Sequence, residues 1–362
     1  MKNPPDQATA TSFSSIPYQP SPPPKDSSPI ILVGCGGIAR RHLEGYRDAG
    51  LRVEALVDPR LSAADALRDE FYPAAKVYQD YREALRTAAG NVVDVTTHPD
   101  IRPSIIRDCL LARKHVLSQK PFVLDLAVGE SLIELAERQR VLLAVNQNGR
   151  WAPHFAFMRN AVAAGHLGKT FAVRMSCDWD HTWVAGTPFE HVRDLLLYDY
   201  AIHWFDMVRC LLPGATAERV YATTGRAPGQ QLMPDLLGQV LIDFDTAQAS
   251  LTFDAMVRYG SEERTYVAGT KGVVKSCGTG NQDQQVTITS AEGVFQPQLQ
   301  GKWFPDGFRG TMSELLWSIA ENRRPSIDAS DNLLSLELCF AALQSVRSGR
   351  AERPGTVRRL PT

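Results

Sequence analysis

The sequence has few cysteines, no long apolar run and no excess of charge of one sign. Its six cysteines are scattered, with no Cys-x-x-Cys pair, at Cys35, Cys109, Cys177, Cys210, Cys277 and Cys339. Isolated thiols in apolar contexts are typical of free cysteines in a reducing compartment, and they argue against disulfides and a zinc site. No apolar stretch reaches the length of a membrane-spanning helix. We therefore expect a cytoplasmic protein with no membrane partner.

The charge balance excludes another class of partner. The 39 basic and 40 acidic residues give a formal net charge of -1. A nucleic-acid-binding surface needs clustered Lys and Arg, and no run here approaches that density. The 362 residues, of which 44% are hydrophobic, are enough for two domains with sizeable cores.

Residues 1–28 differ in composition from the rest of the chain. They contain proline clusters at 4–5 and 20–24 and carry almost no apolar side chains. Because such a segment cannot bury enough apolar surface to fold, we predict a disordered, proline-rich tail. Peptide docking through the proline cluster is the alternative. The segment also lacks the continuous apolar core of a signal peptide.

From residue 29 the chain alternates short apolar strands with amphipathic helices. Strands are expected at 30–33, 52–57, 92–96, 115–118 and 141–145, and helices at 37–49, 61–71, 80–89, 101–113 and 125–139. This alternation predicts a parallel Rossmann sheet with crossover helices over residues 29–148. The polar cluster 146–150 ends the last strand, where such sheets bind ligands.

The pattern changes after Arg150. A helix is expected at 153–164, and helical periodicity returns at 312–320 and 332–343. Between them, strands are expected at 170–176, 217–224, 237–244, 247–255, 264–268, 272–275 and 285–289. The sequence therefore predicts an α/β domain followed by an α+β domain, the second with a large, mostly antiparallel, open-faced sheet.

The strand at 30–33 leads directly into a Gly-x-Gly-x-x-Ala turn. Gly34 permits the tight turn, and Gly36 removes the side chain that would block a pyrophosphate. Ala39 lets the following helix lie close to the strand, and the N-terminus of that helix offers free N–H groups to an anion. The predicted cofactor contacts in this turn are Gly34, Gly36, Gly37, Ile38 and Ala39.

The next strand ends in Asp58, where the adenosine ribose of a dinucleotide would lie. A carboxylate there accepts from both ribose hydroxyls and repels a 2′-phosphate, which favours NAD. Arg60, two residues on, keeps NADP as the alternative.

Two further segments contain candidate catalytic residues. The strand at 115–118 leads to Lys120-Pro121, where the proline would fix the lysine amine over the crevice. An ordinary surface lysine is the alternative. On a helix, Asp199, His203 and Asp206 would share one face, and a histidine flanked by carboxylates suits a general base. The alternatives are a polar stripe on a core helix and a metal site. We expect no metal, because no complementary ligand cluster is present.

Aromatic and histidine side chains lie between these segments. Aromatic rings interleaved with polar groups can line a carbohydrate pocket, whereas each residue alone is as readily a core residue. These residues are Trp151, His154, Trp179, His181, Trp183 and His191.

In order and spacing, these motifs resemble the Gfo/Idh/MocA family, the group of glucose–fructose oxidoreductase and inositol dehydrogenase. The resemblance covers residues 29 to about 349. It is carried by the glycine turn at 34–39, Asp58, Lys120-Pro121, Arg150-Trp151-x-Pro153, Gly165-x-Leu167-Gly168 and Asp199-x-x-x-His203. It implies a substrate and oligomerisation domain over 149–330 and a helix at 331–349 that packs back near the domain junction. It also implies a homodimer or homotetramer formed through the open face of the C-terminal sheet.

The resemblance also implies roles. His203 would take the proton from a hydroxyl of a sugar, cyclitol or glycoside, Lys120 would stabilise the reacting oxygen, and Asp199 would orient substrate or histidine. Hydride would pass to the nicotinamide of NAD. The expected substrate contacts are Arg150, Trp151, Trp179, Trp183, Asp199 and His203, and the further cofactor contacts are Arg60, Thr97, Gln119 and Lys120.

The chain departs from the family pattern at two places. Gln119 stands where the family usually has glutamate, and Thr97-His98-Pro99 with Arg102 replaces Thr-Pro-Asn followed by histidine. Both lie on loops expected near the cofactor. A redox-neutral enzyme with tightly bound NAD and a non-catalytic sugar or dinucleotide sensor are the alternative functions. The intact set of Lys120, Asp199 and His203 argues against the sensor.

Overall fold

The computed structural model describes residues 11–279 and 283–361, which form two compact units. The parallel-sheet unit comprises Pro20–Trp151 and Phe304–Leu334. The antiparallel-sheet unit comprises the described residues up to Gln19, together with Ala152–Trp303 and the chain from Ser335 onward. Each unit is described by itself.

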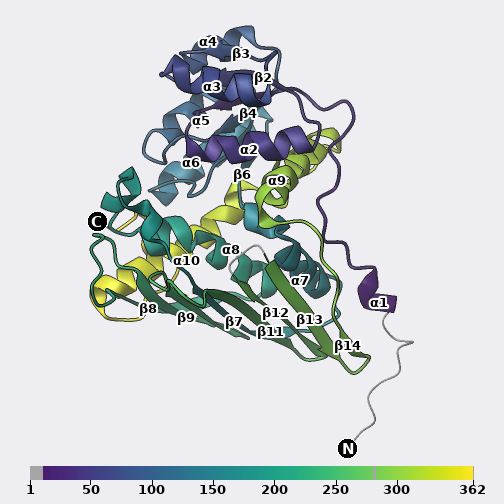
Figure 1. The fold of residues 1–362 in the computed structure, drawn as a ribbon, viewed down its shortest axis with the longest axis vertical. Helices are drawn as coiled ribbons and strands as arrows, with labels where there is room; N and C mark the ends of the chain where they lie inside the picture. Colours follow the sequence, from purple (N-terminus) through teal and green to yellow (C-terminus); the bar gives the residue numbers. More distant parts are fainter. Residues whose placement is uncertain (1–10, 280–282, 362) are drawn as a thin grey trace, which may run out of the picture. The chain divides into compact units, whose positions relative to one another are not determined.

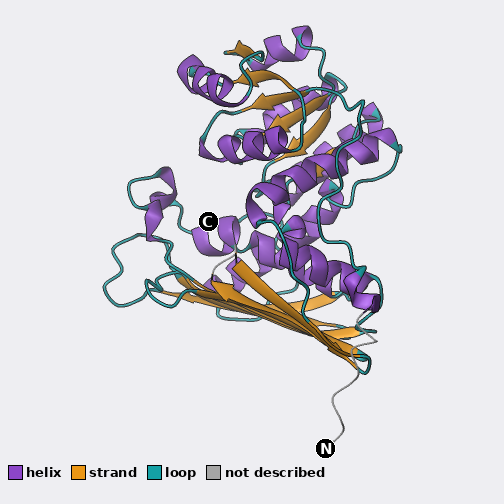
Figure 2. Cartoon of the chain, turned by 45° about the vertical axis from the view of Figure 1, so that its right-hand side comes forward, coloured by secondary structure: helices purple, strands orange, loops and turns teal. Residues whose placement is uncertain are grey.

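The parallel-sheet unit contains a six-stranded sheet with helices packed around it (Figure 2). Its strand order is β3-β2-β1-β4-β5-β6, and every neighbouring pair is parallel. The strands are β1 (Ile30–Val33), β2 (Val53–Val57), β3 (Lys76–Tyr78), β4 (Val92–Val95), β5 (His115–Ser118) and β6 (Leu143–Val145). The helices are α2 (Gly37–Asp48), α3 (Leu61–Phe71), α4 (Tyr81–Thr87), α5 (Arg102–Leu111), α6 (Leu126–Gln139) and, from Phe304, α9 (Trp303–Ala320).

The sheet of this unit brings the predicted cofactor residues to one edge. The strand order reverses at β1, which pairs with both β2 and β4. Val33 is in register with Val57 and with Val95, so all three strands end at the same level. The loops that follow them therefore meet at the carboxyl edge, where ligands bind in sheets of this type. The predicted Rossmann sheet is confirmed, with β3 added as a short, partly exposed strand.

The antiparallel-sheet unit contains an eight-stranded sheet of order β14-β13-β12-β11-β7-β10-β9-β8. Only β7 and β10 pair in parallel. Helices α7, α8 and α10 cover one face of this sheet (Figure 1). Along β9, buried side chains alternate with outward ones, as expected for a sheet covered on one side. The predicted mostly antiparallel, open-faced sheet is confirmed.

In this unit, the strands β7 to β13 lie where strands are expected, although β12 extends four residues further, whereas α1 and β14 were not predicted. Its strands are β7 (Thr170–Asp178), β8 (Ala217–Gly225), β9 (Leu237–Phe244), β10 (Gln248–Asp254), β11 (Glu262–Gly269), β12 (Gly272–Thr279), β13 (Asp283–Ser290) and β14 (Gly293–Phe295). Its helices are α1 (Thr11–Ser14), α7 (Pro153–Ala163), α8 (Ile202–Leu211) and most of α10 (Ala329–Ser348). Short helical turns are η2 (Asn148–Trp151, in the other unit), η3 (Thr182–Val184), η4 (Pro188–His191) and the π-helix η5 (Leu195–Tyr200).

The N-terminal segment differs from the predicted disordered tail. Residues 1–10 lie outside the described residues, but 11–28 follow an ordered path. Phe13 is 2% exposed and Ile16 is 6% exposed. The carbonyl of Pro17 accepts a hydrogen bond from the Asn160 side chain (2.6 Å), and that of Pro22 accepts one from the indole of Trp317 (2.8 Å). The buried side chains of Phe13 and Ile16 and the two carbonyl hydrogen bonds therefore order this segment, although its composition alone predicts disorder.

The division of the chain differs from the predicted boundaries of 149–330 and 331–349. Residues 304–334 group with the parallel-sheet unit. The physical reason is close packing of α9 at two glycines. Gly310 of α9 lies against Trp151, and Gly45 of α2 lies against the backbone of Pro305 and Arg309.

None of the six cysteines, all of which the structure describes, forms a disulfide, and four of them are buried. Within 11–279 and 283–361, no helix combines the length and apolar character needed to cross a membrane.

Candidate active site

The glycine turn leaves the start of α2 open to an anion. Gly34 has φ +102°, and a Cβ there would lie 2.9 Å from Cγ2 of Thr97, so glycine is required. No atom lies within 4 Å of a Cβ added at Gly36 or Gly37. No side chain caps the helix that begins at Gly37, so its first N–H groups face this space. The turn therefore fits a pyrophosphate.

Asp58 is placed against the same turn. It is 5% exposed, its Oδ2 accepts from the backbone N–H of Cys35 (2.9 Å), and its Oδ1 accepts from that of Arg60 (2.9 Å). Oδ2 has a second lone pair for a ribose hydroxyl. The Arg60 side chain is 73% exposed, with its Nε 3.4 Å from Oδ1. These groups fit the adenosine half of NAD.

Replacing Asp58 with asparagine is expected to weaken NAD binding by about tenfold, the value of one charge-assisted hydrogen bond. NADP binding should be weakened less or strengthened, because the negative charge is removed. Titration calorimetry with both nucleotides measures this. In the matched variant Arg60→Gln, only NADP binding should weaken. Equal losses for both nucleotides in Asp58→Asn would contradict the assignment.

A buried polar network leads from α2 to Gln119, the residue after β5. His42 Nδ1 is 2.7 Å from Asp94 Oδ2, and His42 Nε2 is 3.1 Å from Asn146 Nδ2. Asn146 also donates to Gln119 Oε1 (2.8 Å), and its own Oδ1 accepts from Thr311 (2.8 Å). With Nδ1 as the donor to Asp94 and Nε2 as the acceptor from Asn146, the His42 imidazole satisfies both of its contacts. The network therefore fixes the orientation of the Gln119 amide.

Gln119 in turn fixes the backbone at Lys120. Its Oε1 accepts a hydrogen bond from the Lys120 N–H (3.0 Å). This contact needs only an acceptor oxygen, which glutamine provides as well as the family's usual glutamate does. Lys120 is half-buried, and the Lys120–Pro121 peptide bond is cis.

Arg102 explains the second departure from the family pattern. It is 2% exposed and donates to the carbonyls of Thr97 (3.0 Å) and Gln119 (2.6 Å), and also to that of Pro121. One guanidinium thus joins the loops after β4 and β5. The sequence analysis noted Arg102 only as a departure, because nothing local signals that it reaches carbonyls 17 and 19 residues away.

Two of the expected substrate contacts, Arg150 and Trp151, are buried and engaged in packing. Arg150 is 5% exposed, forms an ion pair with Asp331 (2.6 Å) and donates to the carbonyl of Ser326. Trp151 is 9% exposed and belongs to the hydrophobic core of the parallel-sheet unit. Trp151 contacts α9 itself, and Arg150 contacts the segment that follows α9.

In the antiparallel-sheet unit, the predicted catalytic helix is interrupted. Asp199 lies in the π-helix η5, and His203 lies in α8, which begins at Ile202. The change of pitch breaks the expected common face. Asp206 is 1% exposed and accepts a hydrogen bond from the Ser335 hydroxyl of α10 (3.2 Å). Asp199 and His203 remain half-buried. Such π-turns inside helical segments occur frequently at functional sites.

Aromatic rings surround His203. Its imidazole lies edge-on to Trp303 (5.5 Å between centroids) and to Trp204 (6.4 Å). Tyr200 stacks on Trp204 (4.6 Å), and Trp179 stacks on the same Tyr200 (4.1 Å). Sequence reasoning missed Tyr200 and Trp303. Tyr200 is adjacent to Asp199 and could have been found, whereas Trp303 is a hundred residues from His203.

His181 joins the two tryptophans that the sequence analysis assigned to substrate. Its Nδ1 accepts from the indole N–H of Trp179 (2.8 Å) and from that of Trp183 (3.2 Å). Trp183 is 61% exposed. An exposed indole held in this way presents a flat apolar face, the type of surface on which sugar C–H groups pack. His154, by contrast, is fully buried on α7, and burial lowers its pKa to about 3, so it is a neutral core residue.

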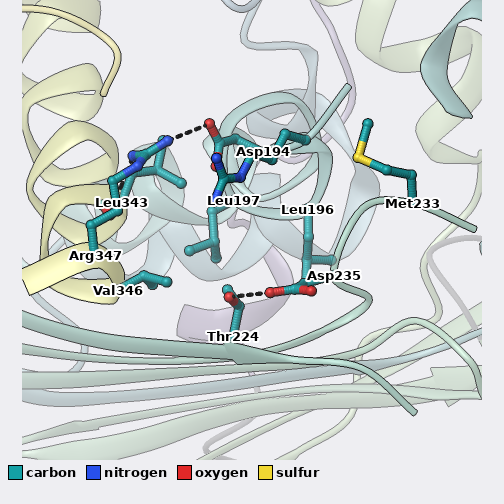
Figure 3. Close-up of a pocket in the computed structure, with 10 residues that line it drawn as sticks. Asp194, Leu196, Leu197, Thr224, Met233, Asp235, Leu343, Val346 and Arg347 are labelled. Carbon is teal, nitrogen blue, oxygen red and sulfur yellow. Dashed lines mark hydrogen bonds and ion pairs between the residues drawn. The ribbon is translucent and has the colours of Figure 1, made fainter. Parts of the chain in front are cut away.

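Beside η5, this unit contains a cavity of about 190 Å³ (Figure 3). Arg347 of α10 pairs there with Asp194 (2.9 Å), and Thr224 donates to Asp235 (2.6 Å). None of the predicted site residues lines it. The ion pair joins the start of η5 to α10 and so supports the segment that carries Asp199. In the part of the chain that the structure describes, no cluster of three or more His, Cys, Asp or Glu side chains is arranged for a metal ion.

The chain matches the two sequence profiles of one family. Residues 29–147 match the profile described as "Oxidoreductase family, NAD-binding Rossmann fold", and residues 155–275 match "GFO/IDH/MocA C-terminal domain". Myo-inositol 2-dehydrogenase of Thermotoga maritima is 26% identical over 343 residues, which are 89% of this chain and 97% of the relative.

Solved structures share the fold over 91% of this chain. An oxidoreductase from Agrobacterium radiobacter in complex with NAD+, L-tartaric acid and magnesium has a TM-score of 0.80 and 19% identity, covering 91% of this chain and 99% of that chain. Scyllo-inositol dehydrogenase from Lactobacillus casei with NAD(H) and scyllo-inositol has a TM-score of 0.77 and 19% identity, covering 91% and 100%. At these identities the likeness establishes the fold.

Proposed function

Because the chain belongs to the Gfo/Idh/MocA family of NAD-binding oxidoreductases, we propose that it oxidises a hydroxyl-bearing carbon of a cyclitol, sugar or glycoside. The observation that carries the proposal is the position of His203, edge-on to the rings of Trp204 and Trp303, together with the exposed indole of Trp183 in the same unit. A general base set among flat apolar rings suits a polyhydroxylated ring, whose C–H faces pack on aromatic side chains. The name of the Thermotoga relative, an inositol dehydrogenase, agrees with this substrate class.

His203 accepts the proton of the substrate hydroxyl, and Asp199 orients the substrate or the imidazole. Lys120 donates a hydrogen bond to the same oxygen as charge develops on it. NAD, when bound on the glycine turn and Asp58, supplies the hydride acceptor. The hydroxyl thus loses its proton to His203 and its carbon loses a hydride, which leaves a ketone.

The proposal assigns the substrate contacts to Trp179 and Trp183, with His181 fixing both indoles. The exposed face of Trp183 suits a ring of the substrate beyond the reacting carbon. Arg150 and Trp151 are assigned to packing.

A screen of polyols, free sugars and glycosides for NAD reduction at 340 nm tests the proposed function. We expect NADH formation with at least one cyclitol or sugar, and its loss in Lys120→Ala and in His203→Ala. Product formation without net NADH would indicate the redox-neutral alternative. Undiminished turnover in both variants would contradict the proposed mechanism.

We also propose that the uncovered face of the eight-stranded sheet forms a homo-oligomer interface. Exposed apolar residues support this, among them Tyr221 (41% exposed) and Leu241 (57% exposed), which are paired in register on β8 and β9. The six free cysteines favour a reducing, cytoplasmic location. Measurement of the molar mass of the protein in solution tests the proposed homo-oligomer.

A further inference from the structure

Five polar atoms inside the antiparallel-sheet unit have no hydrogen-bond partner of good geometry among the described residues. They are both carboxylate oxygens of Glu263, the hydroxyls of Thr265 and Ser276, and the indole nitrogen of Trp204. These side chains are between 0% and 2% exposed. Buried polar groups in folded proteins are almost always satisfied, and ordered water satisfies them where protein groups do not. So many unpaired atoms in one core therefore indicate internal water.

The strand register places these groups close together. Glu263 and Thr265 are two residues apart on β11 and so face the same side of the sheet. Thr265 is in register with Ser276 on β12, and Glu263 is in register with Cys177 on β7. Cys177 in turn lies 3.3 Å from the hydroxyl of Tyr200. The carboxyl group thus lies under the aromatic rings that surround His203.

Among the residues that the structure describes, no cation compensates Glu263. The titratable groups that face it are the Cys177 thiol on β7 and the Tyr200 hydroxyl on η5, and burial together with Glu263 raises the pKa of both. On α7, which packs against β12 and β13, His154 is neutral for the reason given above. Burial raises the pKa of Glu263 to about 8, although the nearby Trp204 indole opposes part of this rise. The carboxyl group is therefore mostly protonated at pH 7.

We propose that Glu263 in its neutral acid form, with ordered water shared with Thr265 and Ser276, supports Trp204 and Tyr200 from below, and that ionisation of Glu263 releases this support. Trp204 follows His203 directly in α8, and Tyr200 stacks on Trp204. Glu263 is thus a positioning residue for His203, acting through the aromatic rings. This inference rests on the proposed role of His203.

The first test does not depend on activity. Near-UV circular dichroism of the full chain, titrated from pH 6 to pH 10, is expected to change with a midpoint near pH 8 in the wild type. The change should be absent in Glu263→Gln, which mimics the neutral acid. It should persist in Glu262→Gln, the neighbouring acid on the opposite face of β11, whose pKa is lowered by Arg264. A wild type without this transition, or a Glu263→Gln variant that retains it, would overturn the proposal.

Stability supplies a second measurement. The folded-state pKa of Glu263 is raised, so its ionisation opposes folding, and wild-type stability falls as pH rises from about 4.5 to about 8. The Tm of Glu263→Gln minus that of the wild type should therefore increase across this window and then level off. A constant difference, or a variant that is unfolded at every pH, would contradict the proposal.

Kinetic measurements test whether Glu263 affects catalysis by His203. At pH 9 about one tenth of Glu263 is neutral, so the ratio of kcat at pH 9 to kcat at pH 7 should be about tenfold lower in the wild type than in Glu263→Gln. KM for NAD should follow the same pH dependence in both proteins. If the ratio of kcat at pH 9 to kcat at pH 7 were equal in the wild type and in Glu263→Gln, Glu263 would not act on His203. If instead His203→Ala kept its turnover while the spectroscopic transition still required Glu263, the proposed function would fall and the buried support would stand.

Discussion

Replacement of His203 with asparagine is expected to lower kcat for hydroxyl oxidation by about 10²- to 10⁴-fold, the range that a positioned general base contributes. Asparagine retains a hydrogen-bonding side chain of similar reach but cannot take up the proton. Lys120→Met, which keeps the alkyl stem and removes the ammonium group, is expected to lower kcat by about 10²- to 10³-fold. Steady-state rates of NADH formation at saturating NAD give both values.

Three controls separate catalysis from folding and from cofactor binding. The Kd of NAD should change by less than about threefold in His203→Asn, because the glycine turn and Asp58 lie in the other unit. His191→Asn, an exposed histidine in the same part of the chain, should have wild-type rates. Near-UV circular dichroism should match the wild type. A His203→Asn variant with a rate within threefold of the wild type would exclude His203 as the base.

Replacement of Gly310 with alanine is expected to destabilise the parallel-sheet unit by about 3 kcal/mol. A Cβ at this position would lie 2.1 Å from Cγ of Trp151 and 2.4 Å from its Cδ1, and Trp151 is fixed within the core. The higher helix propensity of alanine, worth about 1 kcal/mol, offsets only part of this cost. Urea unfolding followed by circular dichroism measures the difference.

A double variant provides the matched control for this prediction. Trp151→Leu removes the ring that the new methyl group would strike, so Gly310→Ala with Trp151→Leu should be less destabilised than the sum of the single changes. The same variants test the assignment of Trp151 to packing, because its replacement should leave KM for the substrate unchanged once the protein is folded. Wild-type stability in Gly310→Ala would show that α9 moves away from Trp151 at little cost.

The fold could be predicted where apolar periodicity and glycine chemistry act locally. The buried run 30–33, the turn at Gly34 and the alternation along β9 each follow from a few neighbouring residues. The start of α9 could not be predicted, because its first residues contain the non-helical Phe304 before Pro305. The ordering of residues 11–28 depends on Asn160 and Trp317, more than a hundred residues away, and composition carries no trace of such contacts.

In the candidate site, too, contacts between residues distant in the sequence could not be predicted. The helical spacing of Asp199 and His203 assumes an uninterrupted α-helix, and the π-helix η5, in which Asp199 lies, could not be predicted from that spacing. Arg150 and Trp151 have residue types that suit a sugar, and only tertiary contacts reveal that both are engaged in packing. Glu263 could not be distinguished from the exposed Glu262 beside it until strand register assigned each to a face.

The contacts of Arg102 have a consequence for the energetics of cofactor binding. Because one buried guanidinium joins the carbonyls of Thr97, Gln119 and Pro121, these loops are ordered before any ligand arrives. A preorganised pocket loses little conformational entropy on binding, so the association of NAD should be driven by enthalpy and need no slow rearrangement of these loops. The residue that departs from the family pattern thereby sets the thermodynamic signature of the cofactor site.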